Sequence, residues 1–169
     1  MLGLDWQQQM DTEPWRSYHG SMMTSKQVWK VLQARMEGGF DTLMPEEQEA
    51  VAIWALVCET MNGTLYQFFW NSSGDLALIA RTGLQRLEQP ITLAALNSAL
   101  DYFGPAYPPE RYKRQEVLED IEAQYGEEVF REASNLIQDY PEEVDEIALL
   151  RLGELYVQRG MWTEETPVT

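Results

Sequence analysis

Residues 62–75 read NGTLYQFFWNSSGD, and this stretch interrupts an otherwise helical pattern. Three consecutive aromatic residues stand between Gln67 and Asn71. An amide group beside buried rings needs a hydrogen-bond partner, because an unpaired buried polar group costs free energy. We therefore interpret the stretch as a short helix over residues 65–70 whose polar neighbours form a network that fixes a tight turn between helices. The alternative is that these side chains contact a ligand or a partner.

Helical signals continue upstream of this stretch. A capping box over residues 24–27 begins a helix that ends at Gly38. Pro45 begins a second helix, which ends near Met61. The run 51–58 within it is apolar nearly all round, so we expect that run at the centre of the core.

Downstream, we expect Asp75 or Ser73 to cap a helix that runs to Leu87. No segment alternates between polar and apolar residues with period two, so strands are not expected. The remaining helices are predicted over residues 90–103, 109–125, 127–140 and 142–159.

These elements predict an all-α fold: a single globular domain of about seven to eight helices in an irregular helical bundle. A chain of 169 residues has the length of one domain, and no repeat or internal boundary divides it. We expect this domain to span residues 24–163. Residues 1–23 have little periodicity and predict a loosely structured N-terminal arm, and residues 164–169 predict a tail.

Charge sets the expected class of partner. The chain carries 28 acidic and 12 basic side chains, for a formal net charge of −16. The imbalance is concentrated between Gln115 and Glu146, where 12 acidic residues accompany one base, Arg131. Such a surface repels nucleic-acid phosphates and anionic lipid headgroups, so we expect neither direct nucleic-acid binding nor membrane binding. The expected partners are basic proteins.

Residue types that carry catalysis or bind metals are scarce. The one histidine, His19, lies in the N-terminal arm, and the one cysteine, Cys58, lies in the apolar run as a buried structural thiol. These counts exclude a zinc site of Cys and His and disfavour a catalytic triad. We expect no enzyme activity, no cofactor and no metal. Neither a signal peptide nor a membrane-spanning stretch is evident, which predicts a cytoplasmic protein.

The 62–75 stretch also carries a family resemblance. Its motif residues are Asn62, Gly63, Gln67, Phe68, Phe69, Asn71, Ser72, Ser73, Gly74 and Asp75, followed later by Tyr102, Phe103 and Gly104. In this order they resemble the signature of a bacterial DNA-mimic protein family, the DMP-nineteen-like domain, over residues 25–115. The resemblance implies an acidic all-helical fold, and the family's named member looks like duplex DNA to a DNA-binding transcription factor. Thr64 and Leu65 depart from the family pattern, which usually has a second glycine and an aromatic residue there.

The acidic residues that would mimic DNA lie outside this motif, so they must be chosen from the helical pattern. A helix over residues 127–140 places Leu136 toward the core and acidic residues on its outer face, and the preceding helix places Tyr125 inward. Residues four apart on a helix are separated by about 6 Å, close to the spacing of successive phosphates on one DNA strand. The expected partner-binding surface comprises Glu116, Glu119, Asp120, Glu127, Glu128, Glu132, Asp139, Glu142, Glu143, Asp145 and Glu146.

Together these observations predict an acidic DNA mimic that binds the basic DNA-binding surface of a protein such as a transcriptional regulator and blocks its access to DNA. An immunity or antitoxin-like inhibitor of a basic nuclease toxin is an alternative, because it would use the same surface. Further alternatives are a small acidic domain with an unassigned ligand pocket, an enzyme that uses residues 62–75 as its pocket, and an acidic surface that serves solubility alone.

The last helix bears on oligomeric state. Its apolar residues, which begin at Ile147, exceed the width of one buried stripe. Either this helix is central to the core or its far side packs on a second copy of the chain. We expect a homodimer on this ground.

Overall fold

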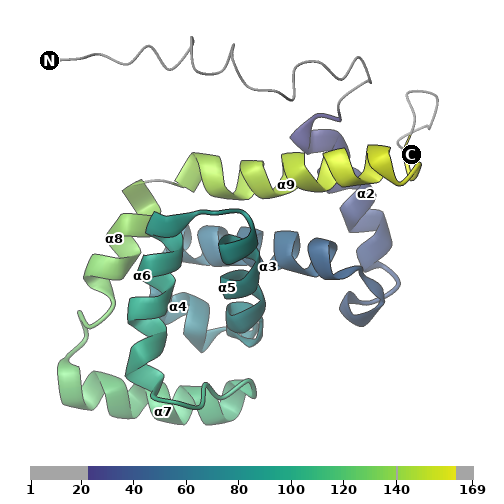
Figure 1. Cartoon of the computed structure of the whole chain (residues 1–169). Coiled ribbons are helices and arrows are strands. Elements are labelled where there is room, and N and C mark those ends of the chain that lie inside the picture. Colours follow the sequence, from purple (N-terminus) through teal and green to yellow (C-terminus); the bar gives the residue numbers. More distant parts are fainter. Residues whose placement is uncertain (1–22, 140, 163–169) are drawn as a thin grey trace, which may run out of the picture.

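The computed structural model describes residues 23–139 and 141–162, with only the backbone for residues 141–143. Within these residues the chain forms eight α-helices and no strand, which confirms the all-α, single-domain prediction (Figure 1). The helices are α2 (Ser25–Met36), α3 (Pro45–Asn62), α4 (Leu65–Trp70), α5 (Ala77–Arg86), α6 (Pro90–Leu100), α7 (Arg111–Tyr125), α8 (Arg131–Asp139) and α9 (Pro141–Gln158). The 3-10 segments are η2 (Phe40–Thr42), η3 (Ser72–Leu76) and η4 (Asp101–Phe103).

Two expectations concern the ends of the chain and membranes. The expected arm lies outside the described residues except for Met23, and the expected tail over residues 164–169 lies wholly outside them. No α-helix of the described ranges is long and apolar enough to cross a membrane.

Helix α3 forms the centre of the fold, in contact with α4, α5, α8 and α9. Its apolar run is buried as predicted, and Ile53 and Leu56 are fully enclosed. Two residues are exceptions. Trp54 is 37% exposed and its ring lies against that of Trp29 on α2, with ring centroids 4.6 Å apart, and Cys58 is half-buried. The neighbours of α3 therefore leave one part of the run open to solvent.

Helix α9 packs against both α2 and α3. A Cβ added at Gly153 of α9 would lie 2.7 Å from a methyl carbon of Val28, so glycine permits the close approach of α2. Leu152 and Tyr156 are also buried. The wide apolar face of the last helix is thus explained by packing within the chain, and the homodimer remains a prediction without support from this helix.

The prediction that Asp75 or Ser73 caps the helix after the motif is wrong. The segment η3 runs directly into α5, and the N-cap position of α5 is Leu76, which forms no side-chain capping hydrogen bond. Asp75 instead pairs with Arg114 at 2.8 Å, and Ser73 Oγ donates to Glu59 at 3.1 Å. Hydrogen bonds to charged groups are stronger than neutral ones, so these distant partners outcompete local capping.

Helix α8 is shorter than predicted. Gly126, with φ of 92°, ends α7, and residues 127–130 form a turn, so α8 begins at Arg131. The turn brings Phe130 into the core, where it is 2% exposed. Glu127 and Glu128 therefore lie in this turn rather than on a helix.

Two side chains that the pattern places in the core are exposed instead. Tyr125, the last residue of α7, is 55% exposed, and Leu136 on α8 is 38% exposed. Tyr125 projects past the packed part of its helix. On α8, Ala133 and Ile137 are buried, so one narrow face of this short helix is enough to cover the core.

Candidate functional site

The motif stretch is organised around the carboxylate of Glu59 on α3. Gln67 Nε2, Asn71 Nδ2 and Ser73 Oγ donate hydrogen bonds to this carboxylate at 2.8, 3.0 and 3.1 Å. Burial raises the pKa of Glu59, but the three donors outweigh it, so the net result is a lowered pKa. The polar network expected from the sequence is confirmed.

Arg114 of α7 holds the same stretch from the other side. Its side chain is fully buried, and its guanidinium donates to the backbone carbonyls of Phe69, Asn71 and Pro109 and pairs with Asp75. A buried charge is tolerated only when it is paired and hydrogen-bonded. Arg114 therefore fixes the motif and the loop before α7 relative to each other.

Sequence reasoning missed Arg114, although a signal was present. Arg114 lies on the same face of α7 as the buried Leu118 and Ile121, and a charged residue on an apolar face needs a buried partner. The same arginine explains a motif glycine. A Cβ at Gly74 would lie 2.6 Å from Arg114 Nε and 2.8 Å from the carbonyl oxygen of Phe69, which leaves no room for a side chain.

The remaining motif residues have structural surroundings as well. Phe68 and Phe69 are fully buried, whereas Asn62 and Ser72 are exposed. Thr64, one of the two departures from the family pattern, caps α4 by accepting from the backbone N–H of Tyr66 at 3.2 Å. The hydrogen-bonding groups of the stretch are thus engaged mainly within the chain.

Helices α7 and α8, which carry most of the predicted partner-binding acids, lie along one edge of the molecule. In Figure 1, α7 lies at the foot, α8 rises from its end, and α9 begins above α8. We call the exposed acids of α7, of α8 and of the turn between these two helices the acidic edge. Its members are Glu116, Glu119, Asp120, Glu127, Glu128, Glu132 and Asp139.

The acidic edge is weakly compensated. The one base between Glu116 and Asp139 in sequence, Arg131, donates to the carboxylate of Glu128, and this hydrogen bond lowers the pKa of Glu128. Glu122, a further acid of α7, accepts from the hydroxyl of Tyr66, and burial together with this bond raises the pKa of Tyr66 to about 12. The other six members of the acidic edge form no ion pair with any residue that the structure describes.

The acids at the start of α9 are differently placed. Glu146 is exposed but accepts a 3.4 Å hydrogen bond from Ser25 of α2. Asp145 is half-buried, and burial raises its pKa. The side chains of Glu142 and Glu143 lie outside the described part of the chain. These four predicted residues are therefore not brought into the acidic edge by any described contact.

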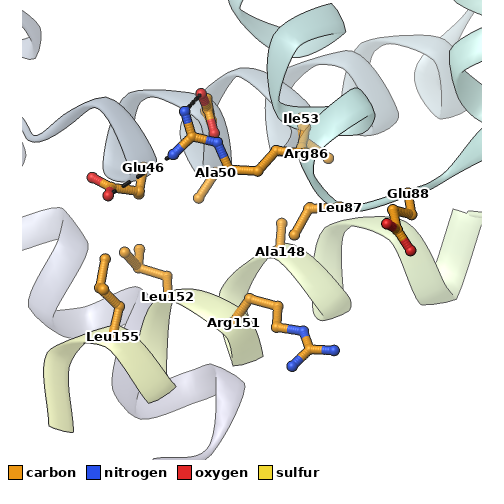
Figure 2. Close-up of a pocket in the computed structure, with 11 residues that line it drawn as sticks. Glu46, Ala50, Ile53, Arg86, Leu87, Glu88, Ala148, Arg151, Leu152 and Leu155 are labelled. Carbon is orange, nitrogen blue, oxygen red and sulfur yellow. Dashed lines mark ion pairs between the residues drawn. The ribbon is translucent and has the colours of Figure 1, made fainter. Parts of the chain in front are cut away.

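A separate cavity of about 420 Å³ lies between α3, the end of α5 and α9 (Figure 2). The guanidinium of Arg86 lies 3.0 Å from the carboxylate of Glu49 and 3.9 Å from that of Glu46. Figure 2 shows Arg86 and Glu46 at the wall of this cavity. Burial raises the pKa of Glu49, and the negative charge of Glu46 adds to this, although Arg86 opposes it. The rest of the lining consists of Ala50, Ile53, Leu87, Glu88, Ala148, Arg151, Leu152 and Leu155.

Sequence reasoning did not find this cavity, because its walls come from segments far apart in the chain. Its volume suits a small ligand. Most of its charged groups, however, are paired: Arg86 with the two carboxylates, and Arg151 with Glu154 at 3.1 Å. A ligand would have to compete with these ion pairs.

The described residues show neither a cluster suited to metal binding nor an activated thiol. No group of three His, Cys, Asp or Glu residues within residues 23–139 and 141–162 is placed to hold a metal ion. Cys58 is half-buried rather than buried as predicted, because it lies near the open part of α3. Burial raises the pKa of its thiol, and the charges of Asp145 and Glu59 add to this, which keeps the thiol protonated and weakly nucleophilic.

Comparison with known proteins gives one match. A family model described as DMP19-like protein matches residues 41–159. The match includes the motif stretch and extends past it through α7, α8 and α9, which carry the acidic residues. No curated protein and no solved structure matches the chain. Because the family model covers well over half of the sequence, the chain belongs to the DMP19-like protein family.

Proposed function

We propose that this chain is an acidic DNA mimic that binds the basic DNA-binding surface of a protein, such as a transcriptional regulator, and blocks its access to DNA. The observation that carries the proposal is the acidic edge. Seven exposed carboxylates follow one another along α7, the turn and α8, and the single base among them is already paired with Glu128. Membership of the family adds support.

The chemistry of such a surface resembles that of a phosphate backbone. Carboxylates accept charge-assisted hydrogen bonds from Arg and Lys, as phosphates do. Glu116 and Asp120 are one turn apart on α7, about 6 Å along the axis, and Glu132 and Asp139 are two turns apart, about 10 Å. A row of carboxylates at these intervals offers successive contacts to a basic groove and steers the encounter over long range.

The charge pattern works against the stability of the free protein, which also supports a role in binding. Like charges at positions i and i+4 destabilise a helix by about 0.2–0.5 kcal/mol per pair. Glu116 and Asp120 form such a pair, and Asp139 lies in the last turn of α8, where the helix dipole disfavours an acid. A surface selected for stability alone would mix the two signs here.

The test measures release of labelled operator duplexes from purified DNA-binding regulators of the source organism. The wild-type chain should release DNA from at least one regulator at low salt and much less at high salt, because screening weakens exposed charge pairs. The double variant Glu132→Lys/Asp139→Lys should lose most of this activity. The matched control is Glu37→Lys/Asp41→Lys, which changes net charge equally at exposed positions away from the acidic edge and should behave like wild type.

The other outcomes contradict the proposal. Equal loss in both double variants would show that only the total charge matters. Inhibition of a basic nuclease without release of operator DNA would favour the immunity or antitoxin-like reading. Absence of binding to either class of protein at low salt would leave the acidic surface with a role in solubility.

A further inference from the structure

Two tyrosines stand exposed at the corner where the acidic edge turns from α7 to α8. Tyr102 of η4 is 40% exposed, and Tyr125 at the end of α7 is 55% exposed. Their rings meet edge to face, with centroids 5.0 Å apart and an interplanar angle of 73°. We call Tyr102 and Tyr125 the tyrosine pair.

The tyrosine pair is held in place from beneath. The ring of Tyr102 meets that of Phe130 at 5.7 Å and 89°, and Phe130 is 2% exposed. Phe130 in turn packs against Phe69 of the core at 5.5 Å. Gln124 Nε2 donates to the hydroxyl of Tyr125 at 3.1 Å. Two aromatic surfaces are therefore presented to solvent with little freedom to move, which lowers the entropy lost when a partner binds.

Exposed carboxylates flank the tyrosine pair in sequence. Exposed Asp101 directly precedes Tyr102, and exposed Glu127 follows Tyr125 after a single glycine. Neither acid forms an ion pair with any residue in the described ranges, and the base nearest to Glu127 in sequence, Arg131, is paired with Glu128. The corner thus offers aromatic faces and negative charge together.

We infer that the tyrosine pair is the docking point for an arginine side chain of the basic partner, an inference that rests on the proposed function. A guanidinium lies over an aromatic face through a cation–π contact, and the neighbouring carboxylates of Asp101 and Glu127 accept its N–H groups. Arginine fits better than lysine, because the guanidinium is planar and more weakly hydrated than an ammonium group.

This docking point supplies what the acidic edge alone lacks. A row of carboxylates attracts any basic protein, whereas aromatic side chains at the centre of an interface provide much of the specific binding energy. The tyrosine pair lies between the acids of α7 and those of α8, so an arginine seated there is flanked by charge contacts on both sides. Its contribution depends little on salt, unlike that of the surrounding carboxylates.

The experiment compares two short synthetic peptides, one of alternating arginine and serine and one of alternating lysine and serine, by fluorescence anisotropy. The wild-type chain should bind the arginine peptide about fivefold more tightly, as a cation–π contact at an exposed site predicts. The variants Tyr102→Leu and Tyr125→Leu, which keep apolar bulk, should bind both peptides equally, with unchanged salt dependence. Tyr102→Phe and Tyr125→Phe keep the rings and should retain the preference.

Tyr112→Leu is the matched control. Tyr112 is 71% exposed on α7 and has no aromatic neighbour in the described residues, so the arginine preference should survive its loss. Circular dichroism melting of each variant checks that it is folded. Equal binding of both peptides by the wild-type chain, or loss of the preference in Tyr112→Leu, overturns the inference. A different result would contradict the proposed function itself: binding of the wild-type chain to the peptides and to DNA-binding regulators that shows no salt dependence.

Discussion

The hydroxyl of Tyr156 on α9 donates a 2.7 Å hydrogen bond to Oε1 of Glu47 on α3, and both side chains are fully buried. Arg35 of α2 donates to both carboxylate oxygens, through Nε to Oε1 and through Nη2 to Oε2 at 3.1 Å, and the backbone N–H of Met44 donates to Oε2 at 2.8 Å. Burial raises the pKa of Glu47, but these donors outweigh it and leave the pKa lowered. A single carboxylate therefore joins α2, α3 and α9.

Removing the Tyr156 hydroxyl should destabilise the fold. Tyr156→Phe leaves one acceptor site of a buried carboxylate unpaired and should lower the free energy of unfolding by about 1–2 kcal/mol. Glu47→Ala leaves both the buried hydroxyl of Tyr156 and the guanidinium of Arg35 without their carboxylate partner. It should lower the free energy of unfolding by about 3 kcal/mol. Urea denaturation measures both values. Tyr112→Phe, at a well exposed position, is the control and should leave stability unchanged.

The Glu59 network should make stability depend on pH. The pKa of Glu59 in the folded chain lies below its ordinary value of 4.5, so its contribution is present above pH 4.5 and is lost as pH falls through the folded-state pKa. Glu59→Gln lacks this titration and presents an amide to three donors. The variant should be less stable at neutral pH, and its stability should fall less steeply below pH 4.5. An identical acid slope in both chains would contradict the assignment.

Gly74 and Arg114 should be energetically coupled. Gly74→Ala places a Cβ in contact with the guanidinium and should cost about 1–3 kcal/mol, as overpacking does. In an Arg114→Met background the flexible methionine side chain can move away from the new Cβ, so Gly74→Ala should lower the free energy of unfolding by less. A double-mutant cycle by denaturation gives the coupling energy, and additive effects would show that the Phe69 carbonyl, not Arg114, excludes the side chain.

Asp139 should oppose stability while it supports binding. It lies in the last turn of α8, which contains no basic residue, and an acid there is unfavourable to the helix dipole. Asp139→Lys should therefore stabilise the free chain by about 0.3–1 kcal/mol at low salt while weakening the release of operator DNA. Glu132, in the first turn of the same helix, is the comparison: its reversal should weaken release without stabilising the chain. Thermal unfolding at two salt concentrations separates these effects.

Local patterns predicted most helix boundaries well. The capping box of Thr24 and Gln27, Pro45 at the start of α3 and the short helix α4 were all confirmed, because each depends on residues within one or two turns. The predicted boundaries were wrong where a residue distant in sequence determines the local structure. The start of α8 was misplaced, since the burial of Phe130 against Phe69 selects a turn over helix.

The candidate site was predictable only in part. The concentration of acids between residues 115 and 146 is visible in the sequence, and helical periodicity identifies the exposed members on α7. Periodicity also placed Tyr125 in the core, because it takes no account of where the packed part of a helix ends. The cavity beside Arg86 had no local signal, since α3, α5 and α9 each contribute a wall.

The helical class, the family motif and the strong negative charge of one segment can be read from the amino-acid sequence, because these properties depend on composition and on neighbours along the chain. The burial of Arg114, the joining of three helices by Glu47 and the contact of Tyr102 with Tyr125 at the acidic edge follow from the folded arrangement. Burial, pairing and ring contacts are properties of three-dimensional neighbours, and in each of these cases the partners come from separate segments of the chain.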